Sequence, residues 1–506
     1  MRLLTKEQAQ ELDHTAINKM GICGVDLMGK AGAAVAKHVL KMVATIDDPK
    51  VAIICGKGNN AGDGYKAAIE LKLNEFNPDV YIIPEENKIS GDALFYYTKC
   101  IDARVPVFHA LEPPIKKYNL IIDALLGTGF HGKLRKPCVN FTKWINKQKS
   151  FIVAVDIPSG IDANSGQIAK NSVKADTTIT FGMTKVGMVL EPGKSHCGKI
   201  IIEDIGFPNI YDKLSGLKFR TATEKMCYEY LGQPAVDTHK YKQGKILIIA
   251  GSRGMTGAAI LAANAALKSG VGLVALVSPK SLNDIYETNI IEGLTISCED
   301  AGDGYFKYEN YAEIMKHCNW ADAILIGPGL GKQPTTIKLI KKIVANSSKP
   351  LIIDADGLHC FSENLNLFNK IKSDVVITPH YGEFARLIGY ENHTIKSNVV
   401  EHLTKFMTKF PETLVLKNAP TITTHKNEAV VNTSGNQGLA SAGTGDVLSG
   451  IITSFIAQGI SPTIAAELGV FVHGKAAEYM TDQNGIRGTI ATDIVLGIGP
   501  ALKKYE

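Results

Sequence analysis

Several common sequence features are missing from this chain of 506 residues, and each absence argues against a class of protein. No C-x-x-C pair occurs, and the nine cysteines are odd in number and scattered, so a disulfide framework or a structural zinc site is not expected. No apolar run approaches the length of a membrane span. The N-terminus, MRLLTKEQAQELD, turns polar too early for a signal peptide. We therefore expect a cytoplasmic protein with reduced thiols and no membrane partner.

A marked excess of one charge is also missing. The 55 basic and 50 acidic residues leave a formal net charge of +5, which gives no electrostatic reason to expect nucleic acid as a partner. What the chain does have is 45% hydrophobic residues and 48 glycines, many of them in short clusters between apolar runs. Its length suits two or three domains. We expect a globular protein that acts on small molecules and forms a homo-oligomer.

Short buried strands alternate with glycine turns and helices. VAIIC (51–55), NLIIDAL (120–126) and FIVAVDIPSG (151–160) are continuous apolar runs followed by polar turns, the pattern of a parallel sheet covered on both faces. The pattern loosens between residues 212 and 242, and a second series begins at KILIIAG. Thr5 with Gln8 predicts a capping box at the first helix. The sequence predicts two tandem three-layer α/β domains, 1–215 and 225–503, and a β-hairpin in TITTHKNEAVVN.

Polar residues follow three strands of the first domain. The motif GKGNNAGDG (56–64) follows a strand and opens a helix, the context of a phosphate cradle. Asp123 and Ser159 each come just after a strand, and any one such residue alone is best explained as a turn cap. Carboxyl ends of parallel strands share one edge, so Asn60, Asp123 and Ser159 together would suit a hard cation. Asp156 would then be an acid or base beside it.

A second glycine loop stands near the C-terminus, in ASAGTGDVLSG (440–450). The N–H groups of Gly443 to Asp446 can form an anion hole for a phosphoryl group in transfer. Asp446, at the start of a helix, can accept a proton from the attacking hydroxyl. A glycine loop followed by an aspartate is the signature of ribokinase-like phosphoryl transfer. His380, just past another strand, is as well explained by packing or surface exposure as by catalysis.

The first domain resembles the NAD(P)H-hydrate epimerase family, also called the YjeF N-terminal domain, through GNNAGDG, DALLGTG and VDIPSGIDANSG. The resemblance implies a Rossmann-like domain that interconverts the R and S forms of hydrated NADH or NADPH. It implies K+ bound by Asn60, Asp123 and Ser159, with Asp156 facing the nicotinamide ring. The family usually has Gly where Ala61 stands, so φ must be negative there. By this resemblance the dinucleotide contacts are Asn59, Asn60, Ala61, Gly62, Asp63, Gly127, Thr128, Gly129, Phe130, His131, Gly132 and Lys133.

The second domain resembles the ADP- or ATP-dependent NAD(P)H-hydrate dehydratases, through GSRGMTGAA, GPGLG, DADGL, TPHYGEFARL and GNQGLASAGTGDVLSG. In that family a nucleotide phosphorylates the hydroxyl of the hydrate, and elimination restores NAD(P)H. The resemblance implies ADP as phosphoryl donor, accompanied by Mg2+. KNAPT replaces K-G-A-G-T, and Pro420 stiffens that loop and removes one N–H donor. The implied hydrate contacts are Ala258, Gly329, His380 and Asp446, and the implied nucleotide contacts are Lys417, Asn418, Ala419, Pro420, Thr421 and Gly445.

Two alternatives remain beside a bifunctional repair enzyme. One is a small-molecule kinase, such as a hydroxymethylpyrimidine kinase, joined to an unrelated N-terminal domain. The other is an N-terminal domain that acts only as a binding or scaffold module, against which the retained Asp156 argues. Both resemblances occur in one chain, in the order expected of a bifunctional enzyme. Its first domain would supply the epimer that its second domain consumes. We therefore favour bifunctional repair of hydrated NADH and NADPH.

Overall fold

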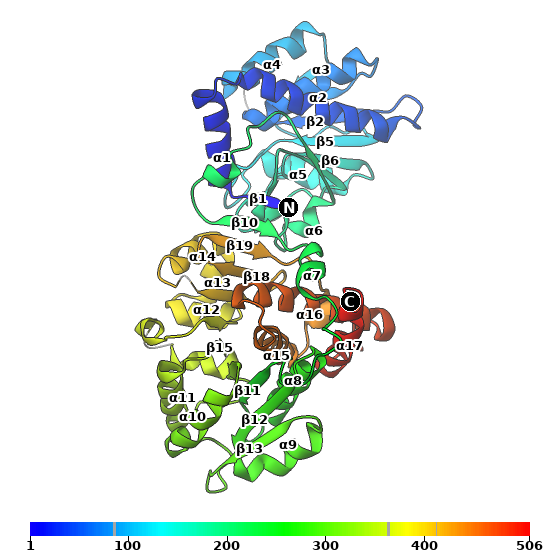
Figure 1. Ribbon diagram of the computed structural model, residues 1–506. Helices are drawn as coiled ribbons and strands as arrows, with labels where there is room; N and C mark the ends of the chain where they lie inside the picture. Colours follow the sequence, from blue (N-terminus) through cyan, green and yellow to red (C-terminus); the bar gives the residue numbers. More distant parts are fainter. Residues whose placement is uncertain (84–87, 362–364, 411) are drawn as a thin grey trace. The chain divides into compact units, whose positions relative to one another are not determined.

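The computed structural model describes residues 1–83, 88–361, 365–410 and 412–506 (Figure 1). The chain divides into two compact units. One comprises Arg2–Phe219 with Lys396–Glu401, and the other comprises Met1, Arg220–Ile395 and His402–Glu506. Each contains a largely parallel sheet with helices on both faces, which is the predicted α/β class. Among the described residues, no helix is long and apolar enough to cross a membrane.

The first unit is built on a parallel sheet with strand order β4-β3-β2-β5-β6-β7-β9. The three apolar runs identified in the sequence form β2, β5 and β6, which pair directly in the order β2-β5-β6. A short parallel pair, β1 with β8, lies outside this sheet. The strands are β1 (Arg2–Leu4), β2 (Val51–Cys55), β3 (Asp79–Ile82), β4 (Val107–His109), β5 (Leu120–Ala124), β6 (Phe151–Val155), β7 (Thr177–Phe181), β8 (Thr184–Lys185) and β9 (Lys199–Glu203).

Helices cover both faces of this sheet because its crossovers run in both directions from β2 and β5 (Figure 1). On one face Ile53 and Ile122 pack with α2, α3 and α4, and on the other Ile54 and Ile121 pack with α5. The predicted capping box of Thr5 and Gln8 opens the first helix. The helices are α1 (Lys6–His14), the π-helix η1 (Thr15–Lys19), α2 (Gly24–Val43), α3 (Asn59–Leu73), α4 (Gly91–Asp102), α5 (Cys138–Lys147) and α6 (Lys194–Cys197).

The second unit is built on the strand order β13-β12-β11-β14-β15-β16-β17-β18-β19, parallel as far as β17. The predicted hairpin is β18 with β19, which pair antiparallel. Between the two units' sheets along the chain lie β10 (Lys218–Thr221) and α7 (Lys225–Tyr230). The strands are β11 (Lys245–Ile249), β12 (Leu273–Pro279), β13 (Leu294–Cys298), β14 (Ala323–Ile326), β15 (Leu351–Ile353), β16 (Val375–Ile377), β17 (Thr413–Leu416), β18 (Ile422–His425) and β19 (Glu428–Val431).

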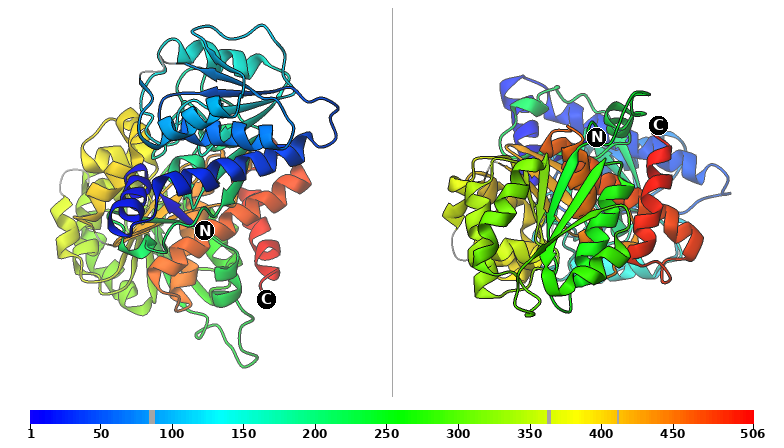
Figure 2. Two further views of the ribbon diagram at one scale, coloured as in Figure 1. Left: turned by 90° about the horizontal axis from the view of Figure 1, so that it is seen from above. Right: turned by 60° about the horizontal axis from the view of Figure 1, so that its bottom comes forward.

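Helices α8, α15, α16 and α17 share one hydrophobic core with one face of this sheet, including Ile248 and Leu325. The right-hand view of Figure 2 shows α10 and α11 on one side of the green strands and the red C-terminal helices on the other. The helices are α8 (Thr256–Lys268), α9 (Asn283–Asn289), α10 (Tyr311–Trp320), α11 (Pro334–Asn346), α12 (Tyr381–Ile388), α13 (Asn392–Ser397), α14 (Val399–Met407), α15 (Thr444–Ala457), α16 (Pro462–Asn484) and α17 (Ala491–Lys503).

Each sheet has a point at which the strand order reverses. In the first unit the reversal lies between β2 and β5, and in the second it lies between β11 and β14. The loops after such strands diverge to opposite faces and leave a crevice at the carboxyl ends, where α/β proteins bind ligands. The glycine loop GKGNNAGDG follows β2, and GPGLG follows β14. The topology thus places these sequence motifs where a ligand site is expected.

Candidate active sites

The structure joins three predicted cation ligands of the first unit through the backbone of Leu126. The Asn60 amide Nδ2 donates to the Leu126 carbonyl oxygen at 3.0 Å. The Leu126 N–H donates to Ser159 Oγ at 2.8 Å, and Ser159 Oγ donates to Asp123 Oδ1 at 2.6 Å. Asn60, Asp123 and Ser159 therefore converge from the ends of β2, β5 and β6, as the strand-end pattern predicts.

Asp123 is fully buried, and burial raises its pKa to about 6 although Ser159 donates to it through both its hydroxyl and its N–H. Within the described residues it forms no ion pair with a basic side chain. A buried carboxylate surrounded by amide, hydroxyl and carbonyl oxygens is suited to a monovalent cation, because the cation would supply the missing positive charge. The donor set fits K+. In the described part of the chain, no three His, Cys, Asp or Glu side chains form a metal site.

A cavity of about 960 Å³ opens beside these strand ends. That volume is in the range of sites for drug-sized ligands and cofactors. Its wall includes Leu27 and Met28 of α2 and Phe181 of β7, which give it an apolar side, together with carboxylate and ammonium groups. Of the residues expected to contact a dinucleotide, those that line it are Asn59, Asn60, Asp63, Gly127, Thr128, Gly129 and Phe130, together with Asp156.

Asp156 follows β6 at a sharp bend, with a φ of 62°, in the left-handed region that non-glycine residues seldom adopt. Its Oδ1 accepts a hydrogen bond from Thr180 Oγ1 at 3.0 Å and contacts the ammonium of Lys185. Two further carboxylates, Asp13 and Asp63, line the same cavity. Loss of contact with water inside the cavity, reinforced by the charge of Asp156, raises the pKa of Asp13 to about 6 and that of the buried Asp63 well above its usual value.

The second site begins at the N-terminus of α15. Gly443 is the N-cap and has a φ of 88°, which a glycine adopts without strain. The N–H groups of Thr444, Gly445 and Asp446 are in the first turn, where an α-helix provides no intrahelical acceptor for them. Burial, together with the negative charge of Asp354, raises the pKa of Asp446 to about 7. The first turn thus combines free N–H donors with a carboxyl group that titrates near neutrality.

A buried ammonium faces this turn. Lys417 follows β17, and its Nζ donates to Asp354 Oδ1 at 2.6 Å. A Cβ at position 445 would come within 3.3 Å of that Nζ, so the absence of a side chain at Gly445 leaves room for the ammonium. Asp354 is fully buried at the end of β15. Burial alone would lower the pKa of Lys417, but the negative charges of Asp354, Glu383 and Asp446 together raise it.

His380 lies beside Lys417 and has a structural task in this structure. Its backbone bridges to Lys417 in parallel register. Its ring Nδ1 accepts hydrogen bonds from the N–H groups of Gly382 and Glu383, at 3.0 and 3.1 Å, and caps α12. Because Nδ1 accepts, the hydrogen-bond network assigns the proton of the neutral ring to Nε2. His380 is therefore a helix cap that can still offer an N–H to a ligand.

Two other predicted contacts of the second site pack against each other. Gly329 has a φ of 62°, and a Cβ there would lie 3.1 Å from the Cβ of Ala258 and 2.5 Å from the carbonyl oxygen of Met255. Only a glycine allows the loop after β14 to approach the start of α8 so closely. The contact lies where the loop after β14 meets the start of α8, the helix that follows β11, next to the point at which the topology predicts a ligand.

Comparisons with known proteins cover both units. Residues 24–187 match the family model described as YjeF-related protein N-terminus, and residues 246–498 match that of NAD(P)H-hydrate dehydratase. The bifunctional NAD(P)H-hydrate repair enzyme of Moorella thermoacetica is 32% identical over 516 residues, covering 100% of this chain and 97% of that protein. The enzyme of the same name from Escherichia coli is 32% identical over 491 residues, 95% of this chain and 90% of that one. The chain belongs to the family of bifunctional NAD(P)H-hydrate repair enzymes.

Solved structures resemble the dehydratase half of this repair enzyme. A ribokinase-like superfamily protein from Enterococcus faecalis is 28% identical, with a TM-score of 0.50, over 57% of this chain and 96% of that protein. The ADP/ATP-dependent NAD(P)H-hydrate dehydratase of Bacillus subtilis, co-crystallised with ATP and Mg2+, is 26% identical, with a TM-score of 0.50, over 56% and 98% of the two chains. The predicted ribokinase-like fold is confirmed.

The remaining dinucleotide contacts predicted for this repair enzyme differ in how exposed they are. The motif GKGNNAGDG follows β2 and opens a helix as predicted, since α3 begins at Asn59. Ala61 and Gly62 are buried in the first turn of α3, and Ala61 has the negative φ that its methyl group requires. His131, Gly132 and Lys133 are exposed and do not line the cavity.

The nucleotide loop expected from KNAPT follows β17 as predicted. Asn418 and Ala419 are exposed there, and the Ala419–Pro420 peptide is cis. Thr421 Oγ1 donates to the Asn418 carbonyl oxygen at 3.1 Å, which closes the turn before β18. The loop is thus ordered by its own contacts, and its role in nucleotide binding stays a prediction.

Three polar residues of the two sites were not predicted from the sequence: Asp13, Lys185 and Asp354. Asp354 could have been predicted as a site residue, because it follows the apolar run LII just as Asp123 follows another apolar run. Lys185 could also have been predicted, because it interrupts the largely apolar segment ITFGMTKVGM. Asp13 could not, because it is one of several charged residues along an amphipathic helix.

Proposed function

We propose that this chain repairs hydrated NADH and NADPH at two separate sites. The first unit interconverts the R and S hydrates, and the second dehydrates the S hydrate with ADP, giving NAD(P)H, AMP and phosphate. We assign these activities to residues 1–215 and 225–503. The similarity to repair enzymes runs through both halves, so a kinase joined to an unrelated binding module is not favoured. The same similarity supports a catalytic first unit and argues against a domain that acts only as a scaffold.

One observation carries the proposal for the second site. Asp446, with a pKa near 7, lies in the first turn of a glycine-capped helix, and the Lys417 ammonium lies against Gly445 of that turn. A hydroxyl that attacks phosphorus must lose a proton, and Asp446 is in place to accept it. The N–H groups of residues 444–446 and the Lys417 ammonium would stabilise the charge that develops on the phosphoryl oxygens. Phosphorylation then makes the hydroxyl a good leaving group.

The remaining contacts follow from this arrangement. Ala258, Gly329 and His380 would hold the hydrate, and the segment 417–421 with Gly445 would hold ADP. Mg2+, bound with the nucleotide, would neutralise phosphate charge. The solved Bacillus subtilis dehydratase, similar over the second unit, was co-crystallised with ATP and Mg2+, which supports a nucleotide and Mg2+ here. In the first unit Asn60, Asp123 and Ser159 would hold K+, whose charge would offset the buried carboxylate, while Asp156 faces the nicotinamide.

The nucleotide specificity gives a direct test. Pure S hydrate is incubated with the full chain and either ADP or ATP, and NADH absorbance and released nucleotides are followed together. We expect one AMP and one phosphate for each NADH formed from ADP. Accumulation of a stable phosphorylated hydrate, or formation of NADH without any nucleotide, would contradict the proposed dehydration. Equal rates with both nucleotides would retain the chemistry but reject a preference for ADP.

A further inference from the structure

Lys185 is a buried lysine at the cavity of the first unit. Its side chain is 4% exposed, and the side chain of its partner Asp156 is 16% exposed. Both residues line the cavity, so the open side of this ion pair faces the space where the substrate would bind. A buried lysine is rare and costly unless it is paired, and this one is paired with the residue expected to act on the substrate.

The position of Lys185 is fixed by several independent contacts. Its backbone is in β8 and is registered against Leu4 of β1. Its ammonium donates to Thr180 Oγ1 at 2.9 Å, and that hydroxyl donates in turn to Asp156 Oδ1 at 3.0 Å. The N–H of Phe181 also donates to this oxygen, at 3.4 Å. The ammonium and the carboxylate are thus held in contact before any substrate arrives.

We propose that Lys185 is a second catalytic residue of epimerisation. It donates a proton to the substrate, while Asp156 accepts a proton from the substrate. This inference rests on the proposed function of the first unit. The hydrate carries its hydroxyl on the ring carbon bonded to nitrogen, so the oxygen and the nitrogen share one carbon and lie close together. A carboxylate and an ammonium in direct contact present an acceptor and a donor at a similarly short separation.

The reaction then balances without an oxidant or a further reactant. Asp156 takes the hydroxyl proton, the oxygen forms a C=O bond, and the ring C–N bond breaks with its electron pair going to nitrogen. The nitrogen takes a proton from Lys185, which gives an open-chain aldehyde beside a neutral lysine and a protonated aspartate. Rotation about the adjacent C–C bond presents the other face of the aldehyde. The reverse steps close the ring with inverted configuration and return both protons.

The test compares Lys185→Arg with the wild type in the full chain. Arginine keeps the positive charge and the hydrogen bonds, but its guanidinium does not give up a proton in proteins. Purified R hydrate is incubated without nucleotide, and the S form is measured by chromatography. We expect Lys185→Arg to lower epimerisation by about 10²–10⁴-fold, the usual contribution of a positioned acid or base. Dehydration of pure S hydrate with ADP should be unchanged.

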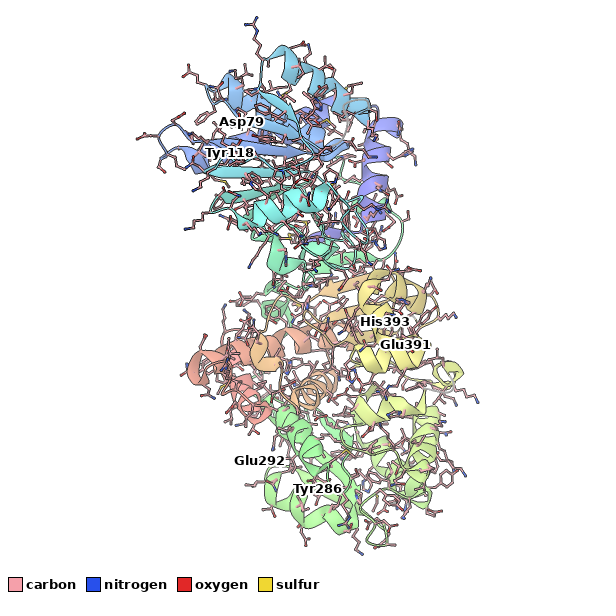
Figure 3. The ribbon with its side chains drawn as sticks, turned by 180° about the vertical axis from the view of Figure 1, so that it is seen from behind. Asp79, Tyr118, Tyr286, Glu292, Glu391 and His393 are labelled. Carbon is pink, nitrogen blue, oxygen red and sulfur yellow. The ribbon has the colours of Figure 1, made fainter. Side chains whose placement is uncertain are left out.

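The matched control is Lys116→Met, which removes a lysine from another Lys–Asp contact of the same unit. Lys116 contacts Asp79, which also accepts a hydrogen bond from Tyr118 at 2.7 Å. Figure 3 labels Asp79 and Tyr118. None of the three residues is among those that line the cavity. We expect Lys116→Met to epimerise like the wild type. If it instead lost as much activity as Lys185→Arg, loss of any such contact would explain the result, and the inference would fail.

A second variant covers the case in which arginine does not fit the buried position. Lys185→Met removes the proton donor, and added methylamine, small enough to enter the cavity, should restore part of the epimerisation. Absence of any rescue would overturn the inference. A fully active Lys185→Arg protein would also overturn it, because charge alone would then suffice. A wild type that leaves R hydrate at its spontaneous rate would instead contradict the proposed function of the first unit.

Discussion

The ammonium of Lys417 lies 2.6 Å from the carboxylate of Asp354, at the ends of two strands of the second unit. Asp354 Oδ1 also accepts a hydrogen bond from the N–H of Ala355 at 2.8 Å, which fixes the carboxylate. Because the lysine is mostly buried, its charge depends on this partner. The pair therefore holds a positive charge next to Gly445, where we propose that a phosphoryl group is transferred.

Asp354→Asn should destabilise the second unit by about 3–5 kcal/mol, because it leaves the buried Lys417 charge without its partner. Thermal unfolding of the full chain, followed by calorimetry, measures this loss. The control is Asp303→Asn, which removes an exposed partner of Lys307 and should leave the transition unchanged. Equal unfolding temperatures for Asp354→Asn and the wild type would show that the ion pair does not stabilise the site.

Asp446→Asn should lower the dehydration of S hydrate by about 10²–10⁴-fold, the usual range for loss of a general base. Nucleotide affinity, measured by calorimetry, should be retained or improve, because one negative charge near the phosphates is removed. Asparagine has nearly the same size and shape as aspartate, so the variant should fold. If the folded variant binds ADP and dehydrates S hydrate at the wild-type rate, Asp446 is only a helix residue.

The raised pKa of Asp446, about 7, predicts a pH dependence of dehydration. A general base acts when it is deprotonated, so kcat/KM for S hydrate should fall about tenfold per pH unit below pH 7. In Asp446→Asn this decrease in kcat/KM at low pH should disappear. The free energy of unfolding should depend on pH in the opposite direction. The folded state keeps the Asp446 proton to a higher pH than the unfolded chain does. The contribution of Asp446 to stability therefore declines as pH rises from about 4 to 7. Asp446→Asn should therefore raise the unfolding temperature at pH 8 but not at pH 4.

The proposed K+ site predicts a salt effect confined to the first unit. Wild-type epimerisation should be faster in KCl than in choline chloride of equal ionic strength, and Asp123→Asn should abolish the difference. Asparagine keeps the shape of Asp123 but removes the buried charge that a cation would offset. Dehydration of pure S hydrate should respond to the two salts equally in both proteins. Wild-type epimerisation that is indifferent to K+ would remove the basis for this site.

Much of the fold could be predicted because its central strands are continuous apolar runs. VAIIC, NLIIDAL and FIVAV form β2, β5 and β6, each buried by helices on both faces. Some of the strands that were not identified lack such runs. β7 has the sequence TTITF, and β13 has LTISC, so hydroxyl side chains interrupt the apolar pattern. These strands are specified by their neighbours in the sheet more than by their own composition.

The sites could be predicted only in part, for a related reason. Glycine loops and strand-end aspartates are local patterns, so Asn60, Asp123, Asp156 and Asp446 were accessible to sequence reasoning. The Asp156–Lys185 contact joins residues 29 positions apart, and it depends on how β7 and β8 follow β6 in space. Local patterns identify the polar residues, but the tertiary fold decides which of them meet.

The most direct test of two sites acting in series uses a mixture of R and S hydrates with ADP and follows the recovery of NADH absorbance. The wild type should convert the whole mixture in a single fast phase. Asp156→Ala should give a fast phase equal to the S fraction, followed by a slow phase at the spontaneous rate of inversion of the R form. Loss of the fast phase in Asp156→Ala, or rapid recovery of the whole mixture by that variant, would contradict the account.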